Sequence, residues 1–150
     1  MPILLLSIFV IIVDQLTKYY IQTHLEPGMS IPVIPKIFHI TYVLNPGAAF
    51  GILEHKTAFF VLIAVLMVGA VLYFYPRIPR EDILLRAGIC LMTGGAVGNV
   101  IDRLKTSYVV DFFDFRIWPV FNVADMAIVT GVIVIIIDII FFKKGLNESE

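Results

Sequence analysis

Charge, cysteine and nucleotide-binding motifs are scarce in this sequence of 150 residues, and each shortage argues against a class of protein. Only 15% of the residues are charged and the net charge is -1, so no nucleic-acid partner is expected. Cys90 is the single cysteine, which leaves neither a disulfide framework nor a thiolate metal site. The histidines form no H-E-x-x-H, and neither a G-x-S-x-G turn nor a Gly-rich phosphate loop occurs. Zinc hydrolases, serine hydrolases and phosphate-loop enzymes are therefore disfavoured.

Apolar residues are abundant instead, at 59% of the chain with a mean hydropathy of +0.94. A helix that crosses a bilayer needs roughly 20 mostly apolar residues. Four segments reach that length, at residues 3–22, 57–75, 83–103 and 121–142. The sequence therefore predicts an all-α membrane protein with four transmembrane helices, folded as a single domain over residues 1–150.

Orientation is predicted from the local density of Lys and Arg. Arg77, Arg80 and Arg86 crowd the short second connection, and Lys143 and Lys144 follow the last helix. Cytoplasmic connections carry an excess of such residues. We therefore expect both termini in the cytoplasm and the other two connections outside it.

The two outer connections differ from plain loops. Within the region of about residues 26–56, the run 36–44 is rich in β-branched and aromatic residues and is bounded by Pro35 and an N-P-G turn. It predicts a small β platform at the interface, since an open sheet edge cannot lie in hydrocarbon. Residues 104–120 form an aromatic-rich stretch suited to the headgroup region.

Several aspartates lie within or next to the predicted transmembrane helices. An ionised side chain inside a bilayer costs free energy, so an aspartate there indicates a function. Asn99, Asp102 and Arg103 share a helical face through their i, i+3 and i+4 spacing, and Asn122 and Asp125 share another. Consecutive helices are antiparallel, so the end of the third helix and the start of the fourth lie on the same side. The two polar faces can therefore meet.

Asp111 lies on the connection between those helices and can reach Asp125. Two carboxylates that share a site hold one proton between them near neutrality, the arrangement of aspartic proteases. One can activate water while the other polarises a carbonyl. The alternative is structural, with Asp111 capping a turn and Asp125 capping the helix or pairing with Arg103, and spacing alone does not decide between them.

The remaining acids have ordinary structural interpretations. Asp14 and Lys18 stand at i, i+4 in the favourable order for a helical ion pair. Asp114 follows an aromatic pair in an outer connection, where a solvated loop carboxylate is expected. Asp138 lies about 20 Å along the helix from Asp125, by the helical rise, and so near the opposite interface.

Four blocks of the sequence resemble the bacterial lipoprotein signal peptidases, or signal peptidase II. They are D-Q-L-T-K at residues 14–18, N-P-G-A-A-F-G at 45–51, G-G-A-V-G-N-V-I-D-R at 94–103, and V-V-D-F at 109–112 with F-N-V-A-D at 121–125. The resemblance implies an aspartic endopeptidase that cleaves diacylglyceryl-modified prolipoproteins before the lipidated cysteine. It makes Asp111 and Asp125 the catalytic pair. It implies a polar shell around substrate and site, made of Asp14, Lys18, Asn45, Gly95, Asn99, Asp102, Arg103 and Asn122.

The resemblance carries further expectations. It implies an extracytoplasmic β-cradle with a short outer helix, no metal or organic cofactor, and inhibition by globomycin-type lipopeptides. The protein is expected to be a monomer surrounded by lipid in the bacterial inner membrane, with its active site on the extracytoplasmic face. Met126 departs from the family pattern, in which a serine commonly follows the second catalytic aspartate.

Two other functions remain open from the residues. A small proton-coupled membrane transporter would use its intramembrane carboxylates as a relay, although such a relay should spread its acids through the membrane depth. A structural membrane subunit would use Gly94 and Gly98 for close helix packing and would tolerate loss of the acids.

Overall fold

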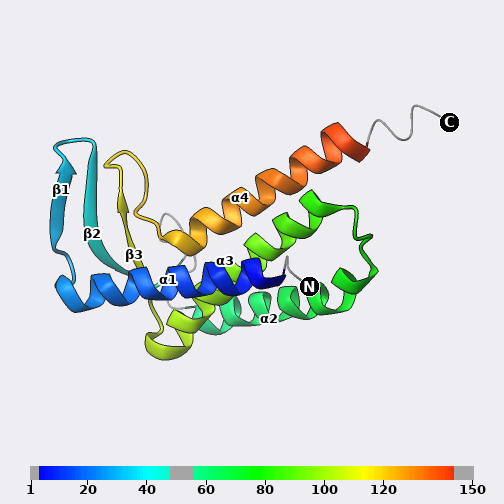
Figure 1. Ribbon diagram of the computed structural model, residues 1–150. Helices are drawn as coiled ribbons and strands as arrows, with labels where there is room; N and C mark the ends of the chain where they lie inside the picture. The colour runs from blue at the N-terminus through cyan, green and yellow to red at the C-terminus, as the bar shows by residue number, and fades with distance from the viewer. Residues whose placement is uncertain (1–3, 48–55, 144–150) are drawn as a thin grey trace.

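Four long helices form the body of the protein (Figure 1). The computed structural model describes residues 4–47 and 56–143, and the described helices are α1 (Leu4–His24), α2 (Thr57–Phe74), α3 (Ile83–Thr106) and α4 (Val123–Ile137). A 3-10 turn, η2 (Tyr75–Arg77), follows α2, and a π-helical segment, η3 (Asp138–Lys143), continues α4. With these extensions each helix is long and apolar enough to cross a bilayer, which confirms the four predicted spans.

Helix α3 is the centre of the bundle, because it contacts α1, α2 and α4. Glycines make these contacts close. A Cβ atom built on Gly94 would lie 2.8 Å from the Ser7 carbonyl oxygen of α1, and one built on Gly95 would lie 2.3 Å from the Ala124 carbonyl oxygen of α4. The close packing predicted for Gly94 and Gly98 is confirmed, since a Cβ atom on Gly98 would lie 2.6 Å from Asp14 Oδ2 of α1, and Gly95 adds a close contact with α4.

A three-stranded antiparallel sheet stands at one end of the bundle, beside the C-terminal end of α1 (Figure 1). Its strands, in spatial order, are β1 (Ser30–Ile34), β2 (Phe38–Asn45) and β3 (Val109–Asp114). Tyr42, Val110 and Phe112 from the sheet pack against Ile21 and Leu25 at the end of α1, and form a buried apolar cluster. This cluster fixes the sheet to the bundle.

The third strand is the main element that the sequence did not reveal. The stretch 109–114 was predicted only as aromatic-rich interfacial chain, because V-V-D-F-F-D lacks the strict alternation of a half-buried strand. It forms a strand because β2 offers its free edge, with Val43 opposite Asp111 and Asn45 opposite Val109. The pairing satisfies backbone groups that hydrocarbon would leave without partners.

Helix boundaries differ from the predicted ones by a few residues. Helix α3 continues past Arg103 to Thr106, where Ser107 ends it in a left-handed conformation with φ 67°. Helix α4 begins at Val123 and not at residue 121, because Asn122 is an extended N-cap residue. No helix lies between α3 and α4 in the described chain, and residues 48–55, which include part of the second motif, lie outside the described residues.

Candidate functional site

Asp111 is placed by the alternation of side chains along β3. Val109 and Asp111 line a pocket on one face of the strand, while Val110 and Phe112 pack on α1 on the other. Asp111 is only 1% exposed, although it lies on a pocket wall. The carboxyl group is therefore aimed by the strand register and not by a flexible loop.

Asp125 is placed by the N-terminal cap of α4. The Asn122 side-chain oxygen accepts a hydrogen bond from the Asp125 backbone N–H at 2.9 Å, and Asp125 Oδ2 accepts one from the Asn122 N–H at 3.2 Å. This capping box satisfies donors that a helix start leaves free. The structural alternative for Asp125 is thus partly right, since the residue is a cap, but the same carboxylate also reaches the pocket that Asp111 lines.

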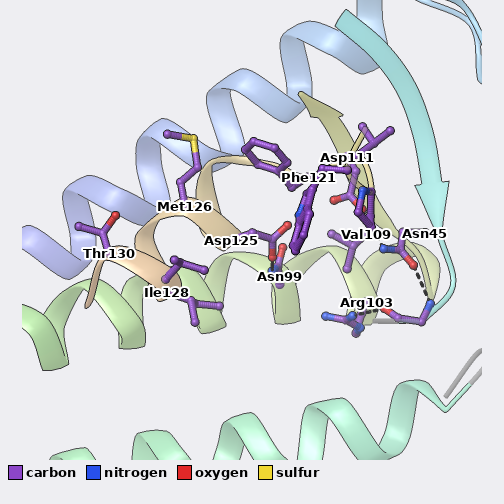
Figure 2. A pocket seen from close by; sticks show the side chains of 15 residues that line it. Asn45, Asn99, Arg103, Val109, Asp111, Phe121, Asp125, Met126, Ile128 and Thr130 are labelled. Carbon is purple, nitrogen blue, oxygen red and sulfur yellow. Dashed lines mark hydrogen bonds between the residues drawn. The ribbon is translucent and has the colours of Figure 1, made fainter. Parts of the chain in front are cut away.

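Amide side chains join the two aspartates. Asn122 Nδ2 donates to Asp111 Oδ1 at 2.6 Å, and Asn99 Nδ2 donates to Asp125 Oδ1 at 2.8 Å. Asn45 Nδ2 donates to Asp111 Oδ2 at 2.8 Å. Each carboxyl group therefore has hydrogen-bond donors on both oxygens, which fixes its plane. Figure 2 shows Asp111 and Asp125 entering the same pocket from β3 and α4.

The electrostatics of Asp111 suit a group that exchanges protons near neutrality. Burial, reinforced by the neighbouring charge of Asp125, raises the pKa of Asp111 to about 7, against the opposing effect of the amide donors Asn45 and Asn122. At pH below about 7 Asp111 is therefore protonated, whereas an exposed aspartate would be ionised.

A layer of buried charge lies behind the pair. Lys18 Nζ is 2.9 Å from Asp14 Oδ2 and 2.9 Å from Asp102 Oδ2. The predicted ion pair between Asp14 and Lys18 is confirmed, and it is extended by Asp102 from α3. Lys18 also donates to Asn99 Oδ1 at 2.9 Å, so the layer is joined to the amides that hold the aspartates.

Arg103 is another residue that lines the pocket. Its guanidinium donates to the Gly47 carbonyl at 2.8 Å and sits over the Phe60 ring, 4.4 Å from the ring centroid. The structure thus shows Arg103 bonded to a main-chain carbonyl of the connection after β2. It lines the pocket beside both aspartates.

The pocket has a volume of about 620 Å³, and its polar lining, apart from Thr130 further along α4, lies around Asp111 and Asp125 at the end near the sheet. Apolar residues from the connection before α4 and from α4 itself complete its walls: Trp118, Pro119, Val120, Met126, Ile128 and Val129. Met126, the departure from the family pattern, is 50% exposed on this apolar wall. A polar reacting group and a long apolar group can therefore bind side by side.

Two of the aspartates considered in the sequence, Asp114 and Asp138, take no part in this arrangement. Asp114 is not the solvated loop carboxylate that was predicted, because β3 carries it to the sheet, where it is 4% exposed and accepts hydrogen bonds from Thr41 and Arg116. Burial acts to raise the pKa of Asp114, but these hydrogen bonds lower it below the ordinary value. Asp138 begins η3, far along α4 from Asp125, and one of its buried oxygens has no hydrogen-bond partner.

Gln15 is a half-buried residue that contacts this buried layer and that the sequence did not single out. Its Nε2 donates to Asp102 Oδ1 at 2.9 Å and to the Gly98 carbonyl at 3.2 Å, so it links α1 to α3. The signal was present, because Gln15 lies beside Asp14 in an apolar helix and inside a quoted motif. The structure brings the predicted site residues together at this end of the bundle. Five of the ten line the pocket: Asn45, Asn99, Arg103, Asp111 and Asp125. Asp14, Lys18, Asp102 and Asn122 support these residues from behind, and Gly95 serves helix contact.

The fold and the site together define a four-helix membrane protein that gathers carboxylates and amides at one end of its bundle. A family model described as "Signal peptidase (SPase) II" matches residues 6–141. The lipoprotein signal peptidase of Moorella thermoacetica is 56% identical over 90% of this chain and 90% of the relative. That of Staphylococcus aureus is 40% identical over 98% of this chain and 93% of the relative.

A solved structure shares the fold of this chain. A structure described as a bacterial membrane enzyme superposes with a TM-score of 0.87 at 42% identity, covering 92% of this chain and 87% of the other. This chain therefore belongs to the signal peptidase II family, as its motifs predicted, and it is a peptidase and a multi-pass protein of a bacterial membrane. None of these relatives supports the transporter alternative.

Proposed function

We propose that this protein is an aspartic endopeptidase that removes the signal peptide from diacylglyceryl-modified prolipoproteins by cleaving before the lipidated cysteine. The observation that supports the aspartic mechanism best is the pair formed by Asp111 and Asp125 at the polar end of an apolar pocket, with amide donors on both carboxyl groups. Relatives named lipoprotein signal peptidase support the substrate class.

In the proposed reaction Asp111 begins protonated and Asp125 ionised, as the pKa of about 7 for Asp111 favours. Asp125 takes a proton from water as the water oxygen bonds to the scissile carbonyl carbon, and Asp111 gives its proton to the carbonyl oxygen. The resulting gem-diol returns a proton to Asp111 as the C–N bond breaks, and Asp125 protonates the leaving nitrogen. The pair ends as it began, and no step uses a metal or an organic cofactor.

The apolar wall of the pocket gives the substrate lipid a place to lie. Residues such as Met126 and Val129 project from a membrane-spanning helix, so acyl chains can reach them from the bilayer. A globomycin-type lipopeptide would occupy the same pocket, with its peptide against the aspartates. One chain supplies both aspartates, so we propose that a monomer is active.

We further propose that the sheet end of the bundle is extracytoplasmic and both termini cytoplasmic. The connection between α2 and α3 lies at the end of the bundle opposite the sheet (Figure 1). Three arginines lie in this connection or in its flanking turns: Arg77, Arg80 and Arg86. Dense cationic connections face the cytoplasm. Lys144, which was predicted to add to this charge, lies outside the described residues.

The test is cleavage of a lipidated precursor by purified protein in bilayer vesicles. Asp111→Asn and Asp125→Asn are each expected to lose at least about 10³-fold in kcat, because each removes one of the two proton-transfer groups. Asp114→Asn is the matched control, since Asp114 lies on the same strand but bonds Thr41 and Arg116 away from the pocket. Robust cleavage by either pair variant would refute the proposal.

A further inference from the structure

Lys18 uses all of its hydrogen-bonding capacity inside the protein. Its side chain is 2% exposed, and Nζ lies 2.9 Å from each of three oxygens, on Asp14, Asp102 and Asn99. An ammonium group has three protons to donate. Lys18 therefore has no donor left for substrate, and among the described residues it does not line the pocket.

The two acids bound by Lys18 each hold a backbone N–H next to a proposed catalytic residue. Asp14 Oδ1 accepts from the Ala124 N–H at 3.0 Å, one residue before Asp125. Asp102 Oδ2 accepts from the Val110 N–H at 3.2 Å, one residue before Asp111. The start of α4 and the strand β3 are thus both fastened to carboxylates that share one cation.

Asn99 provides a second connection from Lys18 to the pair. Its oxygen accepts from Lys18 and from Asn122, at 2.9 and 3.1 Å, while its Nδ2 donates to Asp125 Oδ1 at 2.8 Å. A cation bound to an amide oxygen polarises the amide and strengthens the hydrogen bond that its N–H group donates. The positive charge of Lys18 therefore acts on Asp125 through Asn99, without direct contact.

We propose that Lys18 is a positioning residue for the catalytic pair: it fixes the spacing of the two backbone segments that carry Asp111 and Asp125, and it polarises the Asn99 amide toward Asp125. The inference rests on the proposed function. The charged groups that face the pair from the surrounding helices are Asp14 and Lys18 on α1 and Asp102 and Arg103 on α3.

Lys18→Gln tests this role, because glutamine keeps a polar donor but removes the charge. We expect kcat to fall about 10- to 100-fold through misplaced carboxyl groups, with KM little changed because Lys18 does not touch the pocket. The alkaline limb of the pH–rate profile should move upward, on the order of half a pH unit, because the charge of Lys18 favours the ionised form of Asp111.

Gly94→Ala is the control for a structural role alone. Its Cβ would lie 2.8 Å from the Ser7 carbonyl oxygen, so it strains the same pair of helices, α1 and α3, without changing any charge. It should lower Tm and leave the alkaline limb where it is in the unmodified protein. An equal displacement of that limb by Gly94→Ala would overturn the inference.

A second variant keeps the test decisive if Lys18→Gln does not fold. Asp14→Asn combined with Lys18→Gln removes one charge of each sign. Asp102 is then the one carboxylate of this layer that loses its cation, whereas Lys18→Gln alone leaves both Asp14 and Asp102 without it. It should show a comparable loss of kcat and a smaller upward displacement of the alkaline limb, because loss of the Asp14 charge partly offsets loss of the Lys18 charge. If the folded double variant keeps its kcat and its alkaline limb while Asp111→Asn and Asp125→Asn are both inactive, only the role of Lys18 is refuted. Cleavage by either asparagine variant would instead refute the proposed function.

Discussion

Asp111 differs from an ordinary surface aspartate because of where β3 places it. Its carboxyl group is 1% exposed, faces Asp125 across the pocket, and is held by Asn45 and Asn122. Asp114, three residues further along the same strand, has its pKa lowered by Thr41 and Arg116. Two aspartates on one short strand therefore differ in protonation at neutral pH because of their surroundings and not their type.

The raised pKa of Asp111 predicts loss of activity in alkali. Its folded value of about 7 lies above the ordinary value of 3.8, so the proton needed for catalysis is bound below about pH 7 and lost as pH rises through that value. We expect kcat/KM to fall about tenfold for each further pH unit. The measurement is a pH–rate profile on vesicles, with Tm recorded at each pH as a control. A profile that stays flat from neutrality to about pH 9, with Tm unchanged, would contradict the protonated role of Asp111.

Helix α3 determines how accurately the elements that carry the aspartates are placed. Its glycines let α1 approach on one side and α4 on the other, so its polar end can reach both helices. At that end Asn99 and Asp102 contact groups from α1, α4 and β3. The site is thus supported by packed elements, which hold a reacting geometry better than loops do.

Gly95→Ala is expected to damage both stability and activity. The added Cβ would lie 2.3 Å from the Ala124 carbonyl oxygen, so the first turn of α4, which carries Asp125, must shift. Overpacking of this kind costs about 1–3 kcal/mol, and we expect kcat to fall more than about tenfold as well. Gly69→Ala in α2 is the matched control, since a Cβ there meets nothing within 4 Å. Wild-type Tm and kcat in Gly95→Ala would contradict the close contact.

At the scale of the whole molecule, the polar groups separate to the two ends of an apolar bundle. The sheet and the pocket lie at one end, and the arginine-rich connection lies at the other (Figure 1). Much of the surface between them is apolar and exposed, as on α2, where only Ala64 is buried. Such a surface is stable in lipid and not in water.

Cysteine labelling can test the orientation of the bundle. Ile37→Cys lies in the turn between β1 and β2, where Ile37 is 59% exposed, and Arg80→Cys lies in the α2–α3 connection. Cys90 is 1% exposed and should give little background. A membrane-impermeant maleimide is expected to label Ile37→Cys in intact cells with the outer membrane permeabilised, and Arg80→Cys only after lysis. The reverse labelling pattern would place the pocket in the cytoplasm.

The sequence by itself determined the membrane class, the four spans and the family. Long apolar runs with few charges have one physical solution in lipid, which is the helix. Residues at i, i+3 and i+4 share a helical face whatever the rest of the fold does, so the grouping of Asn99, Asp102 and Arg103 followed from spacing. The ion pair between Asp14 and Lys18 followed in the same way.

Only the tertiary structure decided which strand carries Asp111, why Asp114 is buried, and how Lys18 reaches groups more than 80 residues away in α3. A strand depends on the edge that another segment offers it, and V-V-D-F-F-D does not reveal that edge. Hydrogen bonds between distant segments depend on how closely the helices approach, which here depends on glycines in α3. The sequence therefore named the aspartates, and helix packing and strand pairing placed them together.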